Sequence, residues 1–215
     1  MTKKFKVSKL LASLCLAAPL GFGATTSVQA QTITAVMQAP LRSLDPVITT
    51  AYVIRDYGFM VYDTLLSIDA KGEIKPQMLK KWEVSNDGKT YTFTLRPGLK
   101  WHDGAPVTSV DCIASIKRWA VQDKMGQVMD GLMASMEKID DNSFSMTFKA
   151  PTNIALRALS KPSSLAAFMM PERVAKTSPS QAITESIGSG PFKFVASEYK
   201  PGVQAVFVKN KDYIP

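Results

Sequence analysis

The sequence contains few of the side chains that most often bind metals or act in nucleophilic catalysis. Its 215 residues include one histidine, His102, and two cysteines, Cys15 and Cys112. A structural zinc site usually takes four cysteine or histidine ligands, so this composition argues against one. The spacing of the carboxylates matches no calcium-binding loop. We therefore expect neither a metal site nor a cofactor.

Apolar runs of membrane-spanning length are also missing. The run Leu10–Ala18 follows lysines at positions 3, 4, 6 and 9 and is too short to cross a bilayer. With the small residues around Val28-Gln29-Ala30, this pattern predicts an export signal over residues 1–30 that is cleaved after Ala30. Cys15 lies inside the apolar run, where it does not match a lipid-attachment site.

Positive charge is mild once the predicted signal is set aside. The formal net charge of +8 comes from 26 basic and 18 acidic residues. Without the four lysines of the signal the balance is 22 against 18, or +4. The densest basic groups, Lys80-Lys81 and Lys209–Lys211, are small, whereas nucleic-acid binding needs clustered Lys and Arg with interleaved aromatic residues. We expect no nucleic-acid partner.

Cleavage after Ala30 would leave Cys112 as the sole cysteine of an exported protein. An internal disulfide is then excluded, and the apolar context of Cys112 favours a small buried residue over a nucleophile. The remaining residues, 31–215, are numerous enough to bury a real core as one large domain.

Alternating apolar residues predict three β-hairpins, over residues 82–95, 139–148 and 192–208. A capping box, Thr108 with Asp111, predicts the start of a helix that runs through Trp119. The spacing also predicts a short strand at 33–37, a helix from Tyr52 to near Ser67, and a short helix at 76–80. Strands and helices alternate irregularly, which favours a mixed α+β or α/β fold. The expected sheet core is Tyr91, Phe93, Phe144, Met146, Phe148, Phe192 and Phe194, with Met129, Met133 and Met136 at helical spacing beneath it.

His102 and Asp103, with Ser109 and Cys112 a few residues later, raise the question of a catalytic site. Catalysis would need a nucleophile within reach of a base that a third group orients. His102-Asp103-Gly104, with Pro106 close behind, is typical of a turn instead. The stretch Gly188-Ser189-Gly190 is followed by a proline and lacks the helix N-terminus of a phosphate-binding loop, so it predicts a bend.

Four segments together resemble one family, the family 5 extracellular solute-binding proteins of peptide and nickel ABC transporters. They are an LDP turn followed by VYDTLLSID (61–69), the block LKKWEVSNDGKTYTFTLRPGLKWHDGAPVTSVD (79–111), IDDNSFSMTFKAP (139–151) and IGSGPFKFVASEYKPGVQAVFVKNKDY (187–213). In that family the HDG turn is a structural corner between a hairpin and a helix, which agrees with the interpretation from the residues.

The resemblance implies a two-lobed periplasmic protein that closes on its ligand at a hinge and delivers it to permease subunits in the inner membrane, with no chemistry of its own. Family members are longer, so residues 31–215 correspond to an incomplete first lobe and the second lobe is absent from the sequence. We therefore expect weak ligand binding, or none, from this segment by itself. Members bind di- and oligopeptides, and others take nickel complexes, haem, glutathione, sugars or opines.

By position, the family's ligand contacts in this lobe fall on Thr49, Thr50, Ala51 and Tyr52. An alternative interpretation is that Thr49 and Thr50 only cap the following helix. Three other readings stay open at this point: a binding protein for a non-peptide solute, a truncated remnant without transport function, and a secreted hydrolase that uses His102.

Overall fold

The computed structural model describes residues 32–215, and every helix and strand lies within the unit formed by residues 37–215. The predicted signal and its cleavage site therefore lie outside the described residues. In chain order the elements are α1 (Tyr52–Val61), β1 (Asp63–Thr64), β2 (Leu66–Ile68), β3 (Ile74–Pro76), β4 (Leu79–Val84), β5 (Thr90–Leu95), α2 (Ser109–Gln122), α3 (Lys124–Leu132), β6 (Met133–Asp140), β7 (Ser143–Phe148), α4 (Ile154–Leu159), β8 (Phe168–Met169), α5 (Glu172–Ala175), β9 (Phe192–Phe194), the 3-10 helix η1 (Ala196–Glu198) and β10 (Phe207–Lys209).

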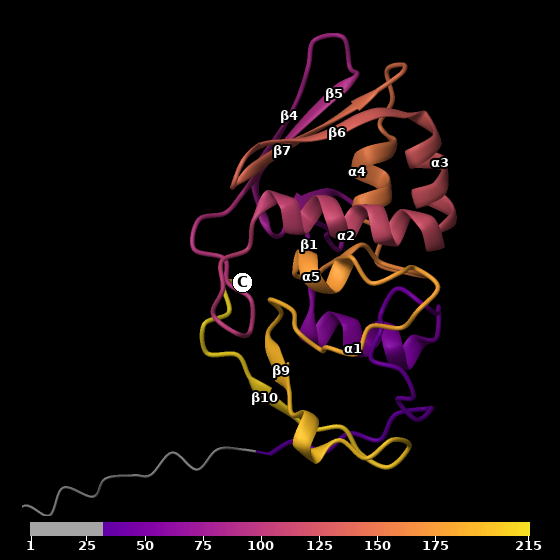
Figure 1. Cartoon of the computed structure of the whole chain (residues 1–215), viewed down its shortest axis with the longest axis vertical. Coiled ribbons are helices and arrows are strands. Elements are labelled where there is room, and N and C mark those ends of the chain that lie inside the picture. Colours follow the sequence, from indigo (N-terminus) through magenta and orange to yellow (C-terminus); the bar gives the residue numbers. More distant parts are fainter. Residues whose placement is uncertain (1–31) are drawn as a thin grey trace, which may run out of the picture. The chain divides into compact units, whose positions relative to one another are not determined.

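A four-stranded antiparallel sheet of order β4-β5-β7-β6 joins the first two predicted hairpins (Figure 1). The two inner strands alternate strictly, with threonine and serine on one face and large apolar residues on the other. Phe93 lies opposite Phe144 and Tyr91 opposite Met146, so the apolar side chains of both strands share one face. All four are buried, which confirms this part of the predicted core.

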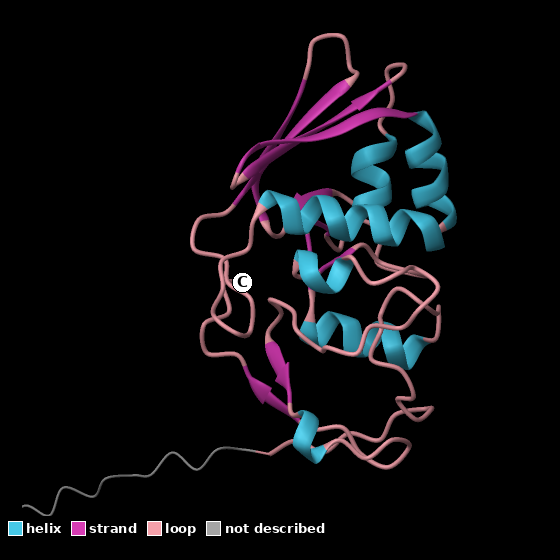
Figure 2. Ribbon diagram, viewed as in Figure 1, coloured by secondary structure: helices cyan, strands magenta, loops and turns pink. Residues whose placement is uncertain are grey.

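Helix α2 covers the apolar face of this sheet, with α3 and α4 on the same side (Figure 2). Its residues Cys112, Ile116 and Trp119 are fully buried and share one core with Phe93 and Phe144. The predicted capping box is present at its start, where Asp111 Oδ2 accepts the Thr108 N–H at 2.8 Å. The helix runs through Trp119 as expected.

A second, smaller core lies around α1, β8 and α5, with β9 and β10 packed against it. The ring of Tyr57 in α1 lies 6.0 Å from that of Phe194 and 6.1 Å from that of Phe207, between ring centres. The third predicted hairpin is confirmed, because β9 pairs with β10. Phe192 is 38% exposed, so its predicted place in the core is wrong.

Three local predictions are wrong for a common reason, namely that pairing with a distant segment overrides the local pattern. Helix α1 ends at Val61, not near Ser67, because Asp63 and Thr64 pair with β8. Residues 76–80 form no helix, because Pro76 ends β3 opposite Leu66 and Leu79 begins β4 opposite Leu95. Met133 and Met136 lie in β6, whereas Met129 is helical as expected.

Residues 33–37 form no strand among the described residues, which makes that prediction wrong as well. Ile33 and Val36 are 84% and 97% exposed, so these side chains bury no apolar surface. A lone extended segment leaves its backbone groups to water, and its weak apolar alternation alone does not stabilise a strand.

A buried ion pair ties three segments together. Asp45 and Arg118 are 0% and 3% exposed, and Nη2 of the arginine lies 2.5 Å from Oδ2 of the aspartate. The aspartate also accepts the N–H groups of Val47 and Ile183, each at 3.0 Å. The guanidinium also donates to the carbonyls of Thr177, Ser178 and Gln181. The Asp45 turn, α2 and the 177–183 loop are thus held at one point.

Two glycines bring the loop before β9 against the end of α1. The Gly190 N–H donates to the carbonyl of Val61 at 2.9 Å. A Cβ atom on Gly188 would lie 2.0 Å from that same carbonyl oxygen, so no larger residue fits without a backbone shift. This close approach explains the glycines of the predicted bend.

We expect Arg118→Met to lower the free energy of unfolding by about 3–5 kcal/mol, because it leaves the Asp45 carboxylate buried without its cation. The matched control is Lys138→Met, which removes the exposed pair with Asp141 and is expected to cost less than about 1 kcal/mol. Urea unfolding of both variants measures the difference. Equal losses would contradict a structural role for the buried pair.

We expect Gly188→Ala to destabilise the protein by about 2 kcal/mol or more, because the new methyl group overlaps the Val61 carbonyl. Gly131→Ala is the control: it lies in α3 with open space around it, so the change is expected to be neutral or stabilising by up to about 1 kcal/mol. The melting temperatures of the two variants, measured by thermal unfolding, test this. An unchanged melting temperature for Gly188→Ala would contradict the close approach of Gly188 to the Val61 carbonyl.

Candidate functional site

The four predicted ligand residues lie at the start of α1. Ala51 occupies the N-cap position, with φ of −60° and ψ of 129°, and no side chain caps the helix. The Thr49 hydroxyl instead accepts the N–H of Ala51 at 3.4 Å. The alternative that Thr49 or Thr50 only caps α1 is therefore wrong. The threonines are available for another role.

A hollow of about 580 Å³ opens at this point of the surface. Three of the predicted residues line it, together with three residues that the sequence did not single out. The only charged side chain among them is an arginine, and no carboxylate lines the hollow. The lining consists of Thr50, Ala51, Tyr52, Arg55, Ser163 and Ser164. Thr49 precedes it without lining it.

The far wall of the hollow is a short loop that is anchored at both ends. Before the serines, the Lys161 ammonium binds the buried carboxylate of Asp123. After them, the indole N–H of Trp119 donates to the carbonyl of Leu165 at 2.8 Å. Because Asp123 also accepts two backbone N–H groups at the start of α3, one carboxylate fixes both the loop and a helix.

The near wall, α1, is packed tightly against the same part of the chain. Gly58 lies so close to the buried ring of Phe168 that an added Cβ atom would approach it to 2.5 Å. Strand β1, two residues after α1, pairs with β8, so that Thr64 lies opposite Phe168. Both walls are therefore connected through β8, and the hollow rests on a rigid support.

Tyr52 and Arg55 form the exposed edge of the near wall. Tyr52 is 64% exposed, so its ring contributes little to the core. The Arg55 guanidinium lies 4.8 Å from the centre of its ring, a cation–π contact. These two residues are one helical turn apart and so share one face of α1. That spacing could have identified Arg55 from the sequence as a neighbour of Tyr52 in the candidate site.

His102 lies at a structural corner rather than beside a nucleophile. Its Nε2 faces the carbonyl of Gly190 at 3.0 Å, and its Nδ1 accepts the N–H of Gly188 at 3.4 Å, which assigns the neutral tautomer with the proton on Nε2. The serine of the hypothetical triad, Ser109, donates its hydroxyl to the carbonyl of Asp140. Asp103 binds Arg173 at 2.9 Å, so it does not orient the imidazole.

Cys112 and Asp63 are buried titratable groups that do not line the hollow. Burial raises the pKa of the Cys112 thiol well above its usual range, so the thiol stays protonated and unreactive. Burial likewise raises the pKa of the Asp63 carboxyl to about 6, although the N–H of Thr64 stabilises the charged form. Neither group faces a base or a nucleophile in the described contacts.

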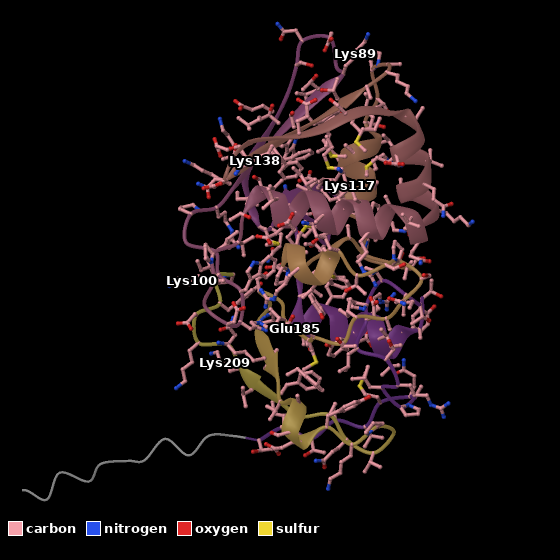
Figure 3. All side chains as sticks on the ribbon, in the orientation of Figure 1. Lys89, Lys100, Lys117, Lys138, Glu185 and Lys209 are labelled. Atoms are coloured by element: carbon pink, nitrogen blue, oxygen red, sulfur yellow. The ribbon has the colours of Figure 1, made fainter. Side chains whose placement is uncertain are left out.

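Metal-ligating side chains and the labelled lysines are dispersed over the described residues (Figure 3). Within residues 32–215, His, Cys, Asp and Glu side chains nowhere gather in threes as a metal ion would need. Lys89, Lys117, Lys138 and Lys209 are spread from the sheet to the β9–β10 hairpin (Figure 3). In the same range, no helix is both long and apolar enough to cross a membrane.

Comparison with known proteins identifies the family. The model for the bacterial extracellular solute-binding proteins, family 5 middle region, matches residues 73–215. The chain belongs to this family. The family 5 chain is 42% identical over 209 residues to a probable peptide ABC transporter periplasmic-binding protein of Sinorhizobium fredii, a match that covers 96% of the chain. It spans only 38% of the length of that relative.

Solved structures show which fold the chain shares. A dipeptide-binding protein from Pseudoalteromonas sp. SM9913, in complex with Met-Leu, has a TM-score of 0.69 at 24% identity over 82% of this chain and 39% of its own. A binding protein of A. tumefaciens R10 in complex with agropinic acid has a TM-score of 0.63 at 28% identity, over 80% of this chain and 34% of its own. The mixed α/β fold of periplasmic binding proteins is thus confirmed for this family 5 chain.

We expect the neutral form of His102 to stabilise the family 5 fold. Burial lowers its pKa below the ordinary value of 6.5, so its contribution is fully present above pH 6.5 and is lost as the pH falls through the folded pKa. As the only histidine in the chain, it gives one imidazole signal to follow by NMR. The NMR titration is preferred to a curve of stability against pH, because such a curve would mix two groups. Asp63, with its raised pKa, favours the folded state as the pH falls, which is the opposite dependence. A folded-state pKa above 6.5 would contradict the stabilisation of the neutral imidazole.

Proposed function

We propose that residues 31–215 form the first lobe of a periplasmic solute-binding protein that serves an ABC importer for di- or oligopeptides. The observation that carries the proposal is the hollow at Thr50–Tyr52. It occurs at the position that the family resemblance implies, in a chain 42% identical to a probable peptide-binding relative. The ligand would lie in this hollow and be closed in by a second lobe, and permease subunits in the inner membrane would receive it.

The chemistry of the described residues supports binding rather than catalysis. His102, the one candidate base, uses both ring nitrogens to hold the Gly188–Gly190 loop. The hollow contains hydroxyl groups, an exposed aromatic ring and a cation, which are the groups that orient a ligand without reacting with it. A hydrolase that depends on His102 would have to abandon these contacts, so we propose that the protein is not an enzyme.

A second candidate function is uptake of an opine. It is favoured by the similarity to the binding protein of A. tumefaciens R10 that was solved with agropinic acid. Peptides and opines both carry carboxylates and extended polar groups, so family membership alone does not separate them. Competition between the two classes of ligand does separate them.

The test is ligand titration by calorimetry on the whole protein expressed from its own gene, including the second lobe that would close over the hollow. It is recovered from the periplasmic fraction, where we expect the chain to start at Gln31. Trialanine and agropinic acid are the two probes. We expect saturable binding of trialanine, and we expect Tyr52→Ala to weaken it by about tenfold or more because the exposed ring is lost. Ile139→Ala, an exposed apolar residue in β6, is the control and is expected to bind as the unchanged protein does.

Each outcome decides between the candidates. Binding of agropinic acid alone would replace the peptide proposal by the opine proposal. A protein that binds neither probe would contradict both proposed uptake functions, whereas an affinity that is insensitive to Tyr52→Ala would remove the hollow as the ligand site.

A further inference from the structure

The hollow carries charge of one sign only, and that sign is positive. Arg55 is the only ionisable group with a full charge among its six lining residues, and the other side chains offer hydroxyl groups that can donate hydrogen bonds. A cation inside a ligand would meet no carboxylate in this lining. An anionic group would meet a guanidinium and several donors.

The donors of Arg55 are largely free for a ligand. Its side chain is 23% exposed, and the nearest carboxylate, that of Asp56, lies 3.7 Å from Nη2. A charge-assisted hydrogen bond is about 2.7–2.9 Å long, so this contact is an ion pair without a strong bond. The guanidinium carbon lies over the Tyr52 ring, and no described residue accepts a hydrogen bond from the guanidinium N–H groups.

The opposite wall presents two hydroxyl groups in a restrained conformation. Neither Ser163 nor Ser164 makes a side-chain hydrogen bond to another described residue, and both are exposed. Ser164 has a φ of 59° and is the only non-glycine residue with positive φ in residues 32–215. Such a conformation costs on the order of 1 kcal/mol or more and persists where the surroundings impose it. The anchored residues Lys161 and Leu165 lie on either side of Ser164.

We propose that Arg55, with the hydroxyls of Ser163 and Ser164, binds a carboxylate of the transported solute and so determines the specificity of this lobe. The inference rests on the proposed function, because it needs a solute in the hollow. Guanidinium and carboxylate match as a planar pair with two parallel hydrogen bonds, which a lysine does not reproduce. The carboxylate would be the C-terminus of a peptide or an acid group of an opine.

The first test compares trialanine with trialanine amide, which lacks the carboxylate, by calorimetry on the protein from its own gene. We expect the unchanged protein to prefer trialanine by about tenfold to a hundredfold, the range for a hydrogen bond to a charged group. Arg55→Gln should abolish the preference by weakening trialanine alone, and Arg55→Lys should restore only part of it. The matched control, Arg157→Gln, changes an exposed arginine of α4 outside the hollow and should keep the full preference.

The outcomes separate this inference from the proposed function. Equal binding of both peptides, or a preference that survives Arg55→Gln, would overturn carboxylate recognition while leaving peptide uptake intact. If only agropinic acid binds, the same variants tested with it decide whether Arg55 holds its acid group.

If neither probe binds, the proposed function fails, and a titration with sodium acetate decides the inference alone. The NMR signal of the Arg55 Nε–H should then shift with acetate in a saturable way and stay unchanged with equal sodium chloride. An equal response to both salts would overturn the inference.

Discussion

The buried pair of Asp45 and Arg118 is the contact on which the arrangement of the elements in residues 37–215 depends. Both charges are removed from water, and each alone would cost several kcal/mol, so the pair persists only when its geometry is closely satisfied. That geometry joins a turn near the start of the described chain to α2 and to the 177–183 loop. The turn leads directly into Thr49–Tyr52, and the pair therefore sets where the hollow begins.

Helix α2, which contains Arg118, connects this ion pair to the sheet and to the segments near the hollow. One face packs under the four-stranded sheet, while its polar groups hold the segments that approach the hollow. Ser115 both accepts the N–H of Met170 and donates to its carbonyl, and Asp111 accepts the N–H of Glu172 at 2.7 Å. Trp119 and Asp123, at its C-terminal end, fix the serine loop. A binding surface built on such supports loses little conformational entropy when a ligand arrives.

The periodic parts of the sequence predicted their structure well. Threonines that alternate with Tyr91, Phe93 and Leu95 specify a half-buried strand, because a shift by one residue would expose every apolar side chain. The Thr108–Asp111 capping box marked a helix start because its hydrogen bonds are local. The helix predicted to continue past Val61 failed because two periods fit the same residues. The run after Val61 satisfies a helix and a strand alike, and only the partner strand β8 decided between them.

For the candidate site, the resemblance to the family indicated Thr50, Ala51 and Tyr52, whereas Arg55, Ser163 and Ser164 went unnoticed. A side chain becomes part of a site when distant segments meet, and Ser163 lies more than a hundred residues after Arg55. The sequence by itself determined the strand pattern of the sheet, the start of α2 and the family. Only the tertiary structure decided that a cation and two hydroxyls line one hollow, because that meeting depends on long-range contacts at Asp123, Trp119 and Phe168 that no local pattern encodes.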